Sequence, residues 1–285
     1  MAQFDYVVST EQRETFERDG VLYLKSVISG ELLDRLQVAA ERAREYEGGF
    51  WYKIYLWRFD PDFRDCCLSS PLPGIAAQLL PSDKVNLLYD QLFVKPPQGD
   101  PTPWHHDLPY WPVDGTSVMS LWLALGEVTL DNGGLEFIRG SHRWDRRFQT
   151  FQSDPDGKLY SEHPDKNPHS EATPDFDAQR DRHDIVAWDL TPGDAVAFHA
   201  LTVHHAKRNA TYNRQVSLAH YCTVCVRARH AFFCAWWWRA PMRILYLLLF
   251  MDNCVVCVTT IPYHQDRRGS DVPTRASSGH CCCSH

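Results

Sequence analysis

This chain has more acidic than basic residues, few long apolar runs and, over most of its length, little cysteine. Its 285 residues carry 29 Lys and Arg against 36 Asp and Glu, a formal net charge of −7. Nucleic acids and anionic membranes repel such a chain because they are negatively charged as well. No apolar run reaches the roughly 18 residues of a membrane-spanning helix. We therefore expect no nucleic-acid partner and, for residues 1–221, no membrane.

Cysteine is almost absent before residue 222. Only Cys66 and Cys67 precede that point, and the other eight of the ten cysteines follow it. The first residues, MAQFDYVVSTEQRETF, lack the basic start and the apolar segment of a secretory signal peptide. The sequence therefore predicts a cytoplasmic protein without disulfides.

Residues 222–285 differ in composition from the rest of the chain. They contain seven Arg and three Asp but no Lys and no Glu, together with WWW, LLL and CCC runs. Their two CxxC pairs are Cys222 with Cys225 and Cys254 with Cys257. The pairs are compatible with a structural zinc site, and the CCC run is compatible with acylation. Alternatively, this Cys/Trp-rich tail is a frame-shifted stretch and not a genuine domain, so its role stays open.

Local patterns predict helices near the N-terminus and short strands further on. Ser9 and Gln12 form a capping box for a helix that stops at Gly20. A strand at 21–24 and helical segments at 30–46 and 75–80 follow. Strand-like runs then lie at 85–95, 118–125, 134–138, 185–190, 195–198 and 216–221. This spacing predicts a β-sandwich or barrel, with an insertion at 145–184 that we interpret as a lid.

The segment Trp104-His105-His106-Asp107 is the strongest chemical signal. In an extended strand alternate side chains share a face, so His105 and Asp107 can reach one cation together. Two His and one carboxylate are the facial ligand set of non-haem Fe(II) oxygenases. The third ligand must come from elsewhere, and the FHALTVHH segment at 198–205 offers three histidines. An HxD triplet alone is also compatible with hydrogen-bonded structural histidines.

Arg214 strengthens the interpretation as an iron site. It follows His204 by ten residues, on the next expected strand. 2-Oxoglutarate chelates Fe(II) at one end, and its distal carboxylate requires a bidentate cation, which Arg supplies better than Lys. Together these residues favour Fe(II) and 2-oxoglutarate far more than the HxD triplet does alone.

Several longer segments resemble one known family. They are KVNLLYDQLFVKPP, PTPWHHDLPYWPV, SLWLAL, DNGGLEFIRGSHRW and GDAVAFHALTVHHAKRN. Together they look like the phytanoyl-CoA dioxygenase family of Fe(II)/2-oxoglutarate oxygenases, over about residues 8–221. The resemblance implies a mainly β fold with flanking helices, a double-stranded β-helix or cupin-like jelly roll, which agrees with the short strands.

The resemblance also implies roles for single residues. The implied metal ligands and catalytic residues are His105, Asp107 and His204. The implied 2-oxoglutarate contacts are Arg214 and, as weaker candidates, Trp122, Lys95 and Gln91. The expected apolar wall of the substrate pocket is formed by Trp104, Tyr110 and Trp111. His205 stands where the family commonly has a small residue, so a distal ligand at His205 in place of His204 stays open.

The implied reaction is hydroxylation of a small organic or acyl substrate with Fe(II), 2-oxoglutarate and O2, releasing succinate and CO2, so the resemblance implies a small-molecule partner. The metal and the co-substrate carry the oxidative chemistry, and the protein positions and shields them. Two alternatives remain at this stage. One is a non-catalytic jelly-roll protein that retains a metal, and the other is an interaction module in which the tail binds zinc or a membrane.

Overall fold

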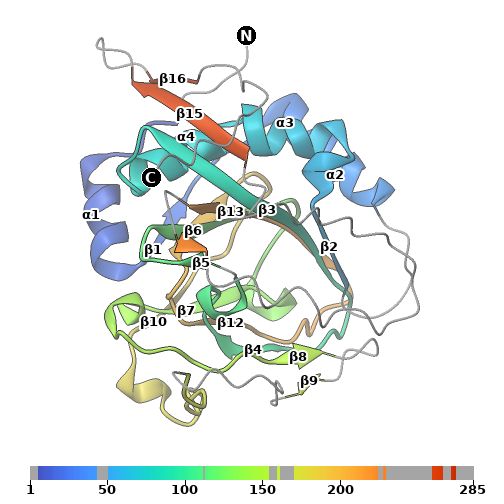
Figure 1. Ribbon diagram of the computed structural model, residues 1–285. Coiled ribbons are helices and arrows are strands. Elements are labelled where there is room, and N and C mark those ends of the chain that lie inside the picture. Colours follow the sequence, from blue (N-terminus) through green and yellow to red (C-terminus); the bar gives the residue numbers. More distant parts are fainter. Residues whose placement is uncertain are drawn as a thin grey trace.

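Two facing β-sheets form the centre of the computed structural model, with helices on the outer side of the larger sheet (Figure 1). The larger sheet contains, in order, β1 (Val21–Leu24), β11 (Ala195–His199), β6 (Val118–Ala124), β13 (Gln215–Thr223), β3 (Lys84–Lys95), β15 (Thr259–Gln265) and β16 (Asp271–Pro273), and β2 (Trp51–Ile54) also pairs with β3. The smaller sheet contains β10 (Ile185–Ala187), β7 (Leu135–Ile138), β12 (His204–Ala206) and β4 (Thr102–His105). Two short pairs are β5 (Val113–Asp114) with β14 (Arg227–Ala228) and β8 (Gln152–Ser153) with β9 (Leu159–Tyr160).

The structure describes residues 6–43, 51–111, 113–153, 159–160, 170–223, 227–228, 259–265 and 271–273. The second CxxC pair, Cys225 and the CCC run lie outside these ranges, as do 154–158 and 161–169 of the expected insertion. The domain boundary at residue 221 stays a prediction. Within the described part of the chain, no helix has the length and apolar character needed to cross a membrane.

Four helices cover the larger sheet: α1 (Thr10–Asp19), α2 (Gly30–Arg42), α3 (Pro61–Ser69) and α4 (Pro71–Leu79). The predicted capping box begins α1, since the Ser9 hydroxyl accepts from the Gln12 amide and the Gln12 side chain accepts from the Ser9 amide. Gly20, in the left-handed region, ends α1 as expected. The sequence analysis missed α3, although Asp60 and Pro61 are typical residues for the start of a helix.

The predicted strands correspond to β1, β3, β6, β7, β10, β11 and β13, with ends moved by a few residues. Side chains alternate between the two faces of the larger sheet. On β13, Leu218 packs against the helices, whereas Ala219 and Tyr221 pack between the sheets. This alternation decides which residues can reach a site in the interior.

Apolar side chains form three layers. One lies between the helices and the larger sheet, and one lies between the two sheets. The third, on the outer face of the smaller sheet, includes Phe148 and Phe176 of the 145–184 segment. Phe148 and Phe176 of that segment therefore pack against the outside of the smaller sheet.

Candidate metal centre

Three side chains with metal-ligating atoms meet between the two sheets. They are His105, Asp107 and His204, whose ligand atoms all lie within 4.8 Å of one another. His105 ends β4 and His204 begins β12, and the two residues are directly paired in the sheet. The Nε2 atom of each imidazole lies 3.7 Å from Oδ1 of Asp107. The fold thus joins two segments that are far apart in the sequence.

Asp107 does not lie on the strand that carries His105. Strand β4 ends at His105, and Asp107 has helical backbone angles (φ −73°, ψ −35°) before the short helix η2 (Leu108–Tyr110). The expectation that strand alternation brings His105 and Asp107 together is therefore corrected. The chain turns after the strand, and this turn places the Asp107 carboxylate next to the His105 imidazole. The hydroxyl of Ser120 on β6 donates to Asp107 Oδ2 at 2.9 Å and orients the group.

Backbone carbonyls fix the tautomer of both histidines. Nδ1 of His105 lies 2.8 Å from the oxygen of Pro103, and Nδ1 of His204 lies 2.9 Å from that of Thr202. A carbonyl oxygen only accepts, so each Nδ1 carries the proton. Burial lowers the pKa of His204 to about 4, and burial together with His204 lowers that of His105 to about 3. Both imidazoles are neutral near pH 7, with an unprotonated Nε2 in the cluster.

The geometry and chemistry of the cluster fit a divalent metal ion. Two donors that share one ion at about 2.1 Å lie at most about 4.2 Å apart, and both 3.7 Å separations satisfy this limit while exceeding a hydrogen bond. Burial raises the pKa of Asp107 because its negative charge is costly there. A bound cation would offset that cost. Two neutral imidazoles and one carboxylate are the facial set that Fe(II) uses in non-haem oxygenases.

His205 lies on the opposite face of β12. Its Nε2 atom is 2.7 Å from Oε2 of Glu136 on β7, outside the interior between the sheets. The question of which histidine joins the cluster is thereby answered in favour of His204.

Three of the expected co-substrate residues face the interior. Lys95, at the end of β3, is 2% exposed, and its Nζ donates to the oxygen of Lys207 at 2.6 Å. Gln91 accepts from the hydroxyl of Tyr221 at 3.1 Å, and Trp122 packs in the layer between the sheets. Gln215, which the sequence analysis did not name, is paired with Lys95 across the sheet. Its buried Nε2 has no hydrogen-bond partner among the described residues.

Arg214 does not face the interior. It immediately precedes β13, on the side of the sheet where the helices pack, and its guanidinium forms an ion pair with Glu41 of α2. Successive residues of a strand point to opposite faces, so Gln215 and not Arg214 is directed inward. This placement corrects the expectation that Arg214 lies across the cavity from the metal.

Aromatic side chains surround His105, but they are only partly the expected ones. Tyr110 lies with its ring centroid 5.9 Å from that of His105, and Trp111 packs in the interior, where its Nε1 donates to Tyr89 at 2.8 Å. Trp104 instead lies in the outer layer of the smaller sheet, which corrects its assignment to the pocket. Phe151 was missed: its ring centroid is 5.2 Å from His105, and its amide donates to the hydroxyl of Tyr110.

A family model supplies the deciding comparison. The model described as "Phytanoyl-CoA dioxygenase (PhyH)" matches residues 16–216, a segment that contains the whole cluster. The chain belongs to the phytanoyl-CoA dioxygenase family. Peroxisomal phytanoyl-CoA dioxygenase of Mus musculus is 25% identical over 244 residues, which cover 73% of this chain and 68% of that protein. Probable phytanoyl-CoA dioxygenase of Caenorhabditis elegans is 22% identical over 247 residues, 75% of each chain.

Solved structures share the fold of this phytanoyl-CoA dioxygenase family member. The non-heme alpha ketoglutarate dependent carbocyclase SnoK from nogalamycin biosynthesis superimposes with a TM-score of 0.62 at 22% identity, over 78% of this chain and 86% of that one. EctD from S. alaskensis, solved with 2-oxoglutarate and 5-hydroxyectoine, gives 0.59 at 22% identity, over 78% and 80%. These matches confirm the predicted jelly roll.

Family membership makes the protein a 2-oxoglutarate-dependent dioxygenase, an oxidoreductase that uses Fe(II) and O2. The predictions of family, enzyme class and cofactors are therefore confirmed. The cytoplasmic location and the individual roles of the site residues stay predictions.

Proposed function

We propose that this dioxygenase hydroxylates a small organic or acyl substrate at an Fe(II) ion held by His105, Asp107 and His204. The convergence of two neutral imidazoles and one buried carboxylate on the same point carries this proposal. When bound, Fe(II) and 2-oxoglutarate supply the O2-dependent oxidation, with succinate and CO2 as co-products.

The remaining residues of the site hold and shield these groups. The carbonyls of Pro103 and Thr202 keep the imidazole protons on Nδ1, so that Nε2 stays available as a ligand. The Ser120 hydroxyl holds one carboxylate oxygen of Asp107 and leaves the other free to bind the metal. Hydrogen bonds of this kind raise metal affinity because they reduce the reorganisation that binding requires.

Lys95 is the residue that we assign to the distal carboxylate of 2-oxoglutarate. It brings a buried ammonium group to the inner face of β3, and burial lowers its pKa to about 8. The buried Gln215 amide, which is without a partner in the described residues, can donate to the same carboxylate. Gln91 and Trp122 lie on the same inner faces of β3 and β6 and would complete this pocket.

The substrate pocket is assigned to Tyr110, Trp111 and Phe151. The rings of Tyr110 and Phe151 lie beside that of His105, and Trp111 packs against Tyr221 between the sheets. In these positions they would keep water from the metal. This apolar wall supports a substrate with an apolar portion next to the reacting carbon. The curated relatives carry phytanoyl-CoA in their names, which supports an acyl substrate.

Succinate release tests the assignment of the metal ligands. With Fe(II), 2-oxoglutarate and O2, we expect the protein to release succinate even without its substrate, and we expect His204→Ala to lower the rate at least about 100-fold. His142→Ala is the matched control, because Nε2 of His142 bonds to the carbonyl of Glu17 in α1, outside the cluster. Equal rates in wild type and His204→Ala would refute the assignment.

A further inference from the structure

A buried polar network lies on the outer face of the smaller sheet, directly behind the metal cluster. His205 follows His204 in the sequence and points away from the interior toward Glu136, with Nε2 and Oε2 2.7 Å apart. The two side chains are only 8% and 5% exposed. Because an ionised carboxylate only accepts, His205 donates this hydrogen bond.

Trp104 extends the network to the strand of the other histidine ligand. Its ring stacks on that of His205, with centroids 3.9 Å apart and planes 27° apart. The indole Nε1 also donates to Asp177 at 3.1 Å. Trp104 precedes His105 as directly as His205 follows His204, so the stack joins the immediate neighbours of two proposed ligands.

Strand alternation explains how Trp104 reaches this position, because it immediately precedes the inward-facing His105 on β4. His105 is paired with His204, but Thr102 is paired with Ala206, so β4 has one residue more than β12 between the two pairs. A bulge of this kind changes the direction of a side chain and is frequent beside active sites. The irregularity lies on the Thr102 side of the His105–His204 pair, and that pair brings Trp104 and His205 to the same outer face.

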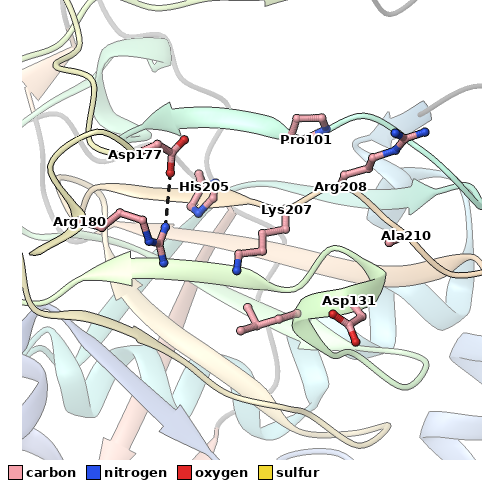
Figure 2. Close-up of a pocket in the computed structure, with 9 residues that line it drawn as sticks. Pro101, Asp131, Asp177, Arg180, His205, Lys207, Arg208 and Ala210 are labelled. Carbon is pink, nitrogen blue, oxygen red and sulfur yellow. Dashed lines mark hydrogen bonds and ion pairs between the residues drawn. The ribbon is translucent and has the colours of Figure 1, made fainter.

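Cations hold Glu136 in place. Arg180 Nη2 lies 2.7 Å from Glu136 Oε1, and Lys207 Nζ lies 3.6 Å from Oε2. Burial raises the pKa of Glu136, but the hydrogen bonds from Arg180 and His205 outweigh it, so the pKa falls below its usual value. Arg180, His205 and Lys207 line a pocket with a volume of about 410 Å³. Figure 2 shows these residues, with Asp177 paired to Arg180. Glu136 is therefore a fixed acceptor for His205.

We propose that His205 is a positioning residue for the metal site: its stack on Trp104 and its hydrogen bond to Glu136 lock β4 to β12 in the register that brings His105 and His204 together. The inference rests on the proposed metal site. Strand β12 has three residues and β4 has four, so backbone pairing alone provides few bonds to fix their register. A slip of one residue would turn a ligand away from the interior.

Two substitutions of His205 separate the contribution of the ring stack from that of the hydrogen bond to Glu136. His205→Ala removes both the stack and the hydrogen bond, and His205→Phe keeps a ring against Trp104 while losing the bond to Glu136. Fe(II) affinity of the apoprotein is measured anaerobically by equilibrium dialysis, with thermal unfolding of the same apoprotein in parallel. We expect the Kd for Fe(II) to rise about 10- to 100-fold in His205→Ala and less in His205→Phe, as for other groups that orient metal ligands.

The matched control is His199→Ala. His199 is also a largely buried histidine, on β11, but its ring bonds to the carbonyl of Thr116 and to the Leu201 amide, outside the network. It should lose stability and keep its Kd for Fe(II). If the two His205 variants lose stability with unchanged Kd, or if His199→Ala weakens Fe(II) binding equally, the positioning role is refuted.

Asp107→Ala distinguishes the failure of this inference from that of the proposed function. If wild type binds Fe(II) and Asp107→Ala does not, the metal site stands, and unchanged affinity in the His205 variants then refutes only their positioning role. If Asp107→Ala binds Fe(II) as wild type does, the metal site itself is refuted.

Discussion

At the scale of single residues, Lys95 carries a buried ammonium group whose charge would be stabilised by binding a carboxylate. Its ammonium group lies at the inner face of β3, where desolvation lowers its pKa and nearby Asp100 only partly opposes the shift. Its Nζ donates to the carbonyl of Lys207. A ligand carboxylate would compensate this charge better than a neutral carbonyl does.

Substitutions of Lys95 and of Arg214 test which of these two residues binds the distal carboxylate of 2-oxoglutarate. We expect Lys95→Met to raise the Kd for 2-oxoglutarate about 10- to 100-fold, because a charge-assisted hydrogen bond contributes roughly 1.5–3 kcal/mol. Arg214→Met should leave it unchanged, since Arg214 pairs with Glu41 on the helical side. Anaerobic calorimetric titration of the Fe(II)-loaded protein measures both values. The opposite pattern would restore Arg214 as the anchor.

The pKa of Lys95 also predicts how 2-oxoglutarate binding depends on pH. The amine is charged below its pKa of about 8 and loses its proton, and its attraction for a carboxylate, as the pH rises through that value. The Kd for 2-oxoglutarate should therefore increase above about pH 8 in wild type. In Lys95→Arg this increase should be absent, because Arg stays protonated. Parallel pH profiles in the two proteins would contradict the assignment.

At the scale of secondary-structure elements, the turn before β11 requires glycine at position 193. Gly193 has φ +93°, and a Cβ there would lie 2.0 Å from the carbonyl oxygen of Ile28. The following Asp194 accepts from the amides of Ser26 and Thr191 and from the hydroxyl of Tyr23. These bonds hold the turn against β1 and the residues that follow this strand, and β1 is the strand that pairs with β11.

Substitution of Gly193 should therefore be costly. We expect Gly193→Ala to lower the free energy of unfolding by at least about 2 kcal/mol, from the positive φ and the backbone clash together. Gly126→Ala is the control, because its Cβ would meet nothing within 4 Å and its φ is not in the left-handed region. Chemical denaturation measures both. A loss in Gly193→Ala no larger than that in Gly126→Ala would contradict the interpretation.

Elements with a local cause could be predicted from the sequence, and those fixed by long-range contacts could not. The capping box of α1 and the alternating runs of β3 and β13 depend only on residues that are close together in the sequence. The outward direction of Trp104 follows from its place next to the inward His105, but its contact with His205 depends on the pairing of β4 with β12, which no local sequence pattern predicts. The sequence analysis placed Arg214 in the interior, but the residue that faces the interior is the next one, Gln215. Successive residues of a strand point to opposite faces of the sheet, so an error of one residue changes the face.

At the scale of the whole molecule, the site depends on contacts between distant segments. The pairing of β4 with β12 brings His105 to His204, and β6 supplies Ser120 for Asp107. The family resemblance pointed to the three residues of the cluster because their motifs are distinctive. Phe151 lies in a segment without such a motif, and its place beside His105 follows only from the packing of the chain around the smaller sheet.

The most direct test of the account is an anaerobic titration of the protein with Fe(II) and then with 2-oxoglutarate, followed by visible absorption. We predict saturation at one Fe(II) per chain and a weak charge-transfer band on addition of 2-oxoglutarate, in wild type and in Arg214→Met. In Asp107→Ala and His204→Ala the band should be absent. A band of wild-type strength in both of these variants would contradict the claim that His105, Asp107 and His204 hold the metal.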